Sequence, residues 1–150
     1  MHIYVLSTPM DKAIQILELI KPFVDEGKIL PRSYEQIAAS IDDFVLLMKS
    51  GELAACAGLK GGEDSETGEI YCMAVKNKFQ SQGYSEKLLY EVMNKARGCS
   101  YSKVFALSKF SKKWFLKYGF VQIEIEQLPK HRQQHIDYKR NSSVFMKFIN

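Results

Sequence analysis

The chain has 150 residues, of which 46% are hydrophobic and 25% are charged, and its formal net charge is +4. These values are those of an ordinary soluble globular protein, and they disfavour a disordered chain and a membrane protein. The length suits one domain, so we expect residues 1–150 to form a single domain with a sizeable core.

Several classes of protein are excluded by motifs that the chain lacks. Its apolar runs, such as Phe44 to Met48, are far shorter than the ~20 residues of a membrane span, and no cleavable leader is recognisable at the N-terminus. We therefore expect a cytoplasmic protein with no membrane partner. Cys56, Cys72 and Cys99 lack metal-ligand spacing, which argues against a disulfide framework and a zinc site. The 21 basic residues are scattered, so no nucleic-acid partner is expected.

The N-terminal part predicts a short strand followed by two helices. Ile3 to Leu6 is typical of a strand, and Asp11 to Val24 carries apolar residues at helical spacing. Ser33 precedes a second apolar pattern, with Gln36 three residues later. This spacing matches a capping box and predicts a short helix.

The middle of the chain predicts a hairpin and then a central strand. Two apolar segments, "DFVLLMK" and "ELAACAGLK", flank the turn residues Ser50 and Gly51. Gly61 to Gly68 is polar and predicts a loop. Glu69 to Val75 is apolar on both faces, as expected for a strand in the interior of a sheet.

The C-terminal half alternates between helical and strand patterns. The expected elements are a helix from Tyr84 to Arg97, a strand from Lys103 to Leu107, a helix from Ser111 to Lys117, a strand from Phe120 to Ile125, a basic helical stretch after Pro129 and a last strand over "SVFMKFI". The order βααβββαβαβ(α)β predicts an α/β fold with a mixed sheet flanked by helices.

One hexapeptide at a helix entrance carries a chemical signal. "QSQGYS" follows the strand that ends at Val75, and it resembles the acetyl-coenzyme A binding motif of the GNAT acyltransferase superfamily, [Q/R]-x-x-G-x-[G/A]. Gln80, Gly83 and Ser85 stand at its fixed positions, with serine in place of the last glycine or alanine. A pyrophosphate needs several convergent N–H donors, which a glycine-containing helix start can supply. The alternative is an ordinary turn ended by glycine.

Longer segments carry a closer resemblance. "ILPRS", "GEIYCMAV", "WFLKYGF" and "DYKRNS" are similar, in order and spacing, to the acetyltransferase domain of bacterial N-acetylglutamate synthases. The resemblance covers nearly the whole chain and implies a GNAT-like acyl-CoA N-acyltransferase fold that transfers acetyl from acetyl-CoA to the α-amine of L-glutamate in arginine biosynthesis. Those synthases commonly carry an amino-acid-kinase-like domain upstream. With 150 residues we expect a stand-alone short form without arginine control through that domain.

The implied reaction needs a base, because an amine attacks only when neutral, and it needs donors for the oxyanion. The resemblance implies Glu69 as the general base, acting directly or through water; the alternative is a solvated carboxylate. Cys72 is assigned to the site wall, although a regular strand would aim it at the face opposite Glu69 unless a bulge intervenes. The tyrosine that the superfamily commonly has in "FYxKxGF" is Phe115 here. Ser108 is therefore the candidate general acid, and Lys113 is a weaker one.

The resemblance also implies the binding residues, and no metal. Arg32 and Arg140 are expected to bind glutamate, since a guanidinium grips a carboxylate with two donors. Lys76 and Lys78 are weaker candidates for the 3′-phosphate. The residues expected to bind acetyl-CoA are Met73, Ala74, Val75, Gln80, Ser81, Gln82, Gly83, Tyr84, Ser85 and Glu86.

Two other functions stay open. A relative could acetylate another amino acid, a polyamine or a protein N-terminus, and a non-catalytic module could simply bind acyl-CoA. The oligomeric state is open as well, including a homodimer.

Overall fold

The structure is a computed structural model that describes residues 11–150. The expected strand from Ile3 to Leu6 lies outside these residues. The described residues form one six-stranded sheet in the order β1-β2-β3-β4-β6-β5. The strands are β1 (Phe44–Lys49), β2 (Glu52–Gly61), β3 (Thr67–Val75), β4 (Lys103–Ser108), β5 (Val121–Ile123) and β6 (Ser143–Phe148). Of these neighbours, β3 and β4 run parallel and the other pairs run antiparallel.

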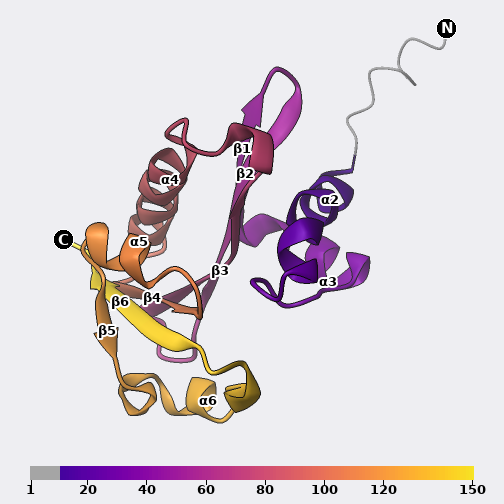
Figure 1. The fold of residues 1–150 in the computed structure, drawn as a ribbon. Coiled ribbons are helices and arrows are strands. Elements are labelled where there is room, and N and C mark those ends of the chain that lie inside the picture. Colours follow the sequence, from indigo (N-terminus) through magenta and orange to yellow (C-terminus); the bar gives the residue numbers. More distant parts are fainter. Residues whose placement is uncertain (1–10) are drawn as a thin grey trace, which may run out of the picture.

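Helices lie on both sides of the sheet, with α4 on one side and α2 with α3 on the other (Figure 1). The helices are α2 (Lys12–Asp25), α3 (Tyr34–Ala39), α4 (Tyr84–Gly98), α5 (Lys112–Lys117) and α6 (Lys130–Gln133), with short 3-10 turns η1 (Ile41–Asp43), η2 (Asn77–Phe79), η3 (Ile125–Gln127) and η4 (Tyr138–Arg140). The predicted capping box is confirmed, because Ser33 and Gln36 each accept the other's backbone N–H.

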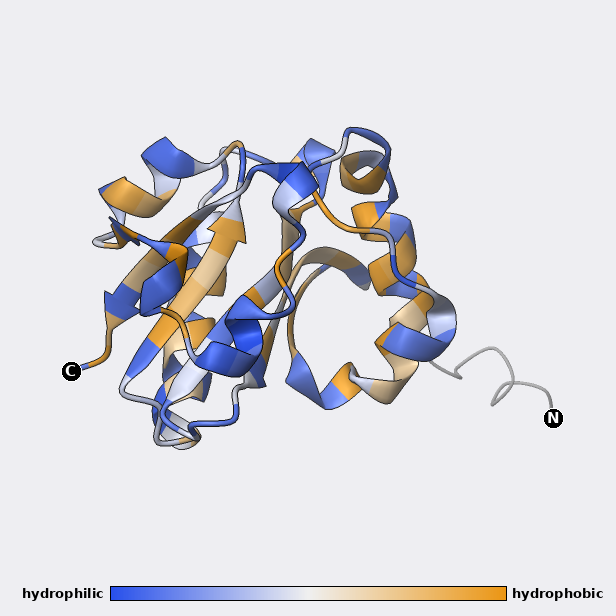
Figure 2. Cartoon of the chain, turned by 90° about the horizontal axis from the view of Figure 1, so that it is seen from below, coloured by the Kyte–Doolittle hydropathy of each residue, from blue (hydrophilic) through white to orange (hydrophobic). Residues whose placement is uncertain are grey.

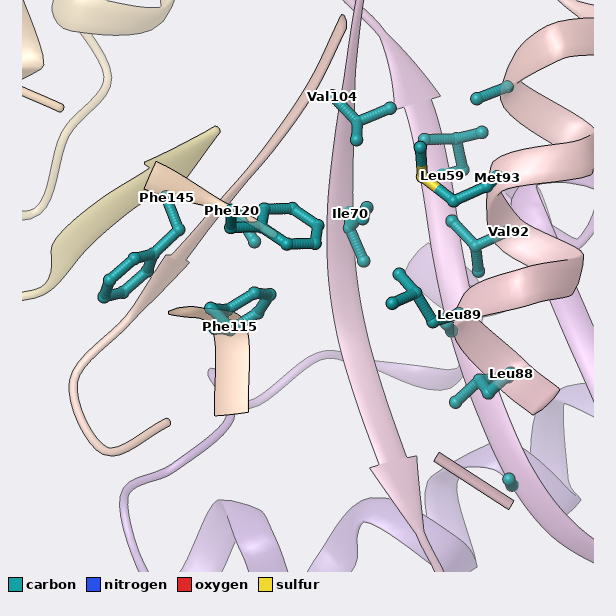
Figure 3. Close-up of a cluster of buried hydrophobic side chains, with 14 residues drawn as sticks. Leu59, Ile70, Leu88, Leu89, Val92, Met93, Val104, Phe115, Phe120 and Phe145 are labelled. Atoms are coloured by element: carbon teal, nitrogen blue, oxygen red, sulfur yellow. The ribbon is translucent and has the colours of Figure 1, made fainter. Parts of the chain in front are cut away.

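The hydrophobic core is divided between the two faces of the sheet. On one face, α4 packs its apolar side chains against β2, β3 and β4, beside a group of phenylalanines (Figure 3); the labelled residues are Leu59, Ile70, Leu88, Leu89, Val92, Met93, Val104, Phe115, Phe120 and Phe145. On the other face, α2 and α3 bury Ile16, Ile20 and Ile37 against the sheet. Figure 2 shows the same pattern, with hydrophobic colour on the long strands and on alternating stretches of the helices. Both faces of β3 are thus covered, as the sequence predicts for a central strand.

The loop between β2 and β3 is shorter than the sequence predicts. The side chain of Asp64 accepts hydrogen bonds from the backbone N–H of Thr67 (3.0 Å) and from its hydroxyl (2.7 Å). This turn lets Gly61 pair with Gly68, so that β3 begins at Thr67 instead of Glu69. Near the C-terminus a strand is shorter than predicted. The expected strand from Phe120 to Ile125 is β5, which ends at Ile123, where the chain turns into η3.

The sheet opens between its two parallel strands. β3 pairs with β4 only from Thr67 to Glu69. Beyond that point β3 stays paired with β2 up to Val75, and β4 stays paired with β6 up to Ser108. The two strands therefore part, and the second half of β3 has no strand on the β4 side.

Candidate functional site

A cavity of about 950 Å³ occupies the opening between β3 and β4. Its walls include β3 from Ile70 to Val75, the end of β4 from Phe105 to Ser108, and the start of α4. The segment before α3 and the C-terminal segment around α6 and η4 close its other end. The opening of the sheet thus makes one cavity that reaches from a helix N-terminus to several cationic side chains.

A β-bulge at Cys72 sets the direction of the side chains on β3. Cys72 has φ +54°, and the register with β2 shifts opposite it, so that two residues of β3 face one of β2. Tyr71 and Cys72 consequently both pack on the α2 side of the sheet, whereas Ile70 and Met73 pack on the α4 side. The bulge brings Cys72 to the wall of the cavity that Glu69 also lines.

Cys72 is only 6% exposed. Burial raises its pKa, and the nearby charge and hydrogen bond of Arg32 only partly oppose this effect. A thiol is a poor nucleophile unless it is deprotonated. The structure therefore gives Cys72 the properties of a wall residue.

Glu69 is held by an arginine from a distant part of the chain. Arg132 donates through Nε to Oε1 (2.7 Å) and through Nη2 to Oε2 (3.0 Å), while its Nη1 donates to the carbonyl oxygen of His135 (2.7 Å). Glu69 is 8% exposed and lines the cavity, so it is not the freely solvated carboxylate of the alternative interpretation. Sequence reasoning missed Arg132, although it lies in the basic stretch after Pro129.

Ser108 lies where β4 ends and the chain turns toward α5. Its Oγ accepts a hydrogen bond from the backbone N–H of Ser111 (3.1 Å). This bond uses a lone pair, so the hydroxyl hydrogen remains available to donate into the cavity that Ser108 lines. Lys113, the weaker candidate, is exposed and is not among the residues lining this cavity.

The entrance of α4 presents unsatisfied N–H groups. Gly83 is the N-cap residue with φ +86°, and it has no side chain that could cap the helix. Ser81 also has a positive φ (+62°), so two residues within three have a left-handed backbone conformation. Uncapped N–H groups of this kind, at the positive end of a helix, suit an anion.

Seven of the residues predicted to bind acetyl-CoA line the cavity, namely Met73, Ala74, Val75, Gln80, Ser81, Tyr84 and Ser85. Gln82, Gly83 and Glu86 belong to the same loop and helix turn but do not line it. Lys76 and Lys78 both contact Glu52 at 2.8 Å, outside the cavity. Their hydrogen bonds, led by that of Lys76, lower the pKa of Glu52.

Cations gather at the opposite end of the cavity. Three of the four arginines in the chain line it, Arg32, Arg132 and Arg140, and Arg97 lies elsewhere. Arg132 is neutralised by Glu69. Arg32 and Arg140 donate to backbone carbonyl oxygens, those of Leu30 (3.1 Å) and Gly27 (3.5 Å), and neither forms an ion pair within residues 11–150.

The model of the acetyltransferase (GNAT) family matches residues 11–120. The chain belongs to the GNAT acetyltransferase family. The predicted superfamily is thereby confirmed, and so is the mixed α/β fold, since solved GNAT structures match this one.

Two relatives of this GNAT chain illustrate its similarity to longer proteins. An amino-acid acetyltransferase of Neisseria meningitidis is 38% identical over 135 residues, which are 88% of this chain and 30% of that protein. The structure of N-acetylglutamate synthase from Neisseria gonorrhoeae complexed with coenzyme A and N-acetyl-glutamate matches with a TM-score of 0.85 and 37% identity, covering 90% of this chain and 32% of that chain. The chain thus spans about a third of the length of these relatives.

A more distant match shows the fold alone. A structure from Mycobacterium tuberculosis has a TM-score of 0.80 at 18% identity, and the match covers 92% of this chain and 94% of that one.

From residue 11 to 150, no helix is long and apolar enough to cross a membrane. Over the same range, no three His, Cys, Asp or Glu side chains are grouped so that they could hold a metal ion.

Proposed function

We propose that this GNAT domain transfers the acetyl group of acetyl-CoA to the α-amine of L-glutamate, as in cytoplasmic arginine biosynthesis. The observation that carries the proposal is the single cavity lined both by the uncapped start of α4 and by Arg32 and Arg140. The first feature suits a pyrophosphate, and the second suits an acceptor with two carboxylates. The gonococcal synthase, which is complexed with coenzyme A and N-acetyl-glutamate, supports the same pairing of ligands.

The coenzyme would lie along the unpaired side of β3. Its pyrophosphate would receive N–H groups from the turn at Ser81 and Gly83 and from the first turn of α4. Its pantetheine arm would bind the backbone of Met73, Ala74 and Val75, where β4 no longer pairs with β3. An N–H group of this edge would also stabilise the oxyanion that forms on the acetyl group.

The chemistry requires two protons to leave the acceptor, because an ammonium group becomes an amide with one N–H, and one proton to reach the thiolate. Glu69 would take the first proton from the ammonium group, through a water molecule while Arg132 is bound, because a carboxylate has about four acceptor positions and Arg132 uses two. The free amine would then attack the thioester carbon, forming the C–N bond. As the C–S bond breaks, the nitrogen would lose its second proton to solvent, and the hydroxyl of Ser108 would donate to the departing sulfur and regain its proton from solvent.

The test is the release of coenzyme A thiol from acetyl-CoA with a panel of amino acids and amines. We expect release that depends on glutamate, and we expect Arg140→Ala to abolish it. Arg97→Ala is the matched control, because it removes the one arginine outside the cavity and should retain full activity. Release with an amine that has no carboxylate, unaffected by Arg140→Ala, would contradict the proposed acceptor. Coenzyme binding without release for any acceptor would indicate a binding module instead.

A further inference from the structure

Two cationic side chains lie over the ring of Tyr71 at the acceptor end of the cavity. The guanidinium carbon of Arg32 lies 5.1 Å from the ring centroid, and Nζ of Lys60 lies 4.8 Å from it. All three residues line the cavity. A cation over an aromatic face is held by the ring quadrupole, which restrains an otherwise flexible side chain.

The ring itself is fixed by three neighbours. The hydroxyl of Tyr71 donates to Oδ2 of Asp43 (2.6 Å), and the ring meets the edge of Phe44 at a centroid distance of 5.5 Å. On β2, Gly58 leaves room for it, since a Cβ there would lie 2.6 Å from two ring carbons. Partial burial, aided by Asp43, also raises the pKa of Tyr71, so the ring remains a neutral phenol. Tyr71 is therefore a rigid support.

Neither cation on this support has a carboxylate partner among the described residues. Arg32 donates to the carbonyl oxygen of Leu30, and the contact of Lys60 is with the ring. Glu69 lies opposite Lys60 in the register of β2 and β3, but the ion pair of Glu69 is with Arg132 and not with Lys60. Two positive charges thus line one cavity without neutralisation, which favours an anion between or beside them.

We propose that Lys60 is a second carboxylate-binding cation of the acceptor site, and that Tyr71 is the positioning residue that holds Lys60 and Arg32 for this task. The inference rests on the proposed function and deepens it: the acceptor is selected for its negative charge by cations whose placement depends on an aromatic ring. Gly58 contributes to this arrangement, because any side chain at position 58 would displace the ring of Tyr71.

The alternative is that Lys60 is a solvated lysine that lies over a ring without binding the acceptor. The chain contains a matched control for this alternative. Lys117 lies over the ring of Tyr118 at 5.4 Å, and neither residue is among those lining the cavity. Lys117→Met removes the same charge and the same type of contact. It should leave the kinetic constants unchanged.

The experiment compares the KM for glutamate with that for glutamine, which has the same size and one carboxylate fewer. Lys60→Met should raise the KM for glutamate about tenfold, with kcat and the KM for acetyl-CoA unchanged, and should reduce discrimination against glutamine. Tyr71→Leu should act in the same direction, and Tyr71→Phe, which keeps the ring, should restore nearly the natural KM. An unchanged KM for acetyl-CoA and an unchanged melting temperature separate this result from misfolding.

Two results would overturn the inference alone. The first is turnover of glutamate by Lys60→Met with the natural KM. The second is an equal rise in KM for Lys117→Met, which would reveal a general effect of charge. If the natural protein itself shows no glutamate-dependent turnover, the proposed function fails and the inference falls with it, so the two failures are distinguishable.

Discussion

Glu69 and Arg132 form an ion pair with two hydrogen bonds at the wall of the cavity. Both donor–acceptor distances are short, and the side chains are 10% and 25% exposed, so solvent screens the pair only partly. Removing one partner leaves the other charge in a half-buried site, which costs more than removing both.

A double-mutant cycle tests this pair. Glu69→Gln and Arg132→Gln should each lower the free energy of unfolding, and the double variant should lose less than the sum of the two. We expect a coupling of about 0.5–3 kcal/mol, measured by urea denaturation. Additive losses would mean that the two side chains do not interact in solution.

The sequence indicated residues that line the cavity, but it did not indicate their partners. Glu69, Cys72, Ser108, Arg32 and Arg140 could be named from the family resemblance of their segments, and all of them line the cavity. Their surroundings depend on residues far away in the chain, such as Arg132, which lies 63 positions after Glu69. No local pattern encodes such a contact, because periodicity and spacing describe only neighbours within one element.

At the scale of elements, the turn between β2 and β3 depends on one carboxylate. Burial opposes the charged form of Asp64, but hydrogen bonds from Thr67 and from the backbone of Glu66 and Thr67 outweigh it and lower the pKa of Asp64. The folded pKa is thus below the unfolded one. The resulting stability is fully present above the unfolded value of about 3.9 and is lost as the pH falls through the folded value.

This sign leads to a prediction for acid unfolding. Between pH 5 and pH 2 the natural protein should lose stability more steeply than Asp64→Asn, in which the linked proton uptake is absent. Chemical denaturation at several pH values measures the slope. Equal slopes for Asp64→Asn and the natural protein would contradict the assignment.

The packing of Tyr71 on β2 gives a second prediction for an element. Gly58→Ala should destabilise the protein by about 1–3 kcal/mol, because the new methyl group would lie 2.6 Å from the ring and the strand pair must shift. Gly98→Ala is the control, since no other group lies within 4 Å of its Cβ position. Thermal unfolding of the two variants measures the difference. A Gly58→Ala variant as stable as Gly98→Ala would show that the ring moves aside freely.

The helices and strands between residues 11 and 150 could be predicted because their local signals agree with the fold. The capping box at Ser33, the apolar stripe of α4 and the hairpin of β1 and β2 are local patterns. The start of β3 was predicted two residues late, because its polar beginning is stabilised by Asp64 and not by hydrophobic periodicity. The opening between β3 and β4 was not predicted, since pairing between distant strands leaves no periodic signal in the sequence.

At the scale of the whole molecule, the cavity lies between parts of the sheet that share few backbone hydrogen bonds. β3 and β4 pair over only three residues, from Thr67 to Glu69 on β3. A ligand that bridges the opening would bind the folded state alone. Such a ligand stabilises the protein by mass action.

Coenzyme A should therefore raise the melting temperature. At a hundred times its Kd the stabilisation is about 2.7 kcal/mol, which corresponds to roughly 5–10 °C for a chain of this size. Differential scanning fluorimetry measures the shift. Pantetheine, which lacks the pyrophosphate, should give a smaller shift. No shift with millimolar coenzyme A would contradict the proposed coenzyme.

The separation of β3 from β4 also affects how the specificity of this protein can evolve by mutation. Donors that belong to the main chain are the same whichever side chain is attached, so exchanges among most amino acids at Met73 or Val75 would leave coenzyme recognition intact. Only proline removes the N–H group itself. In the proposed site, the acceptor end would depend instead on individual side chains such as Lys60 and Tyr71. Mutation can therefore redirect this enzyme toward new acceptors much more easily than it can alter its acyl donor.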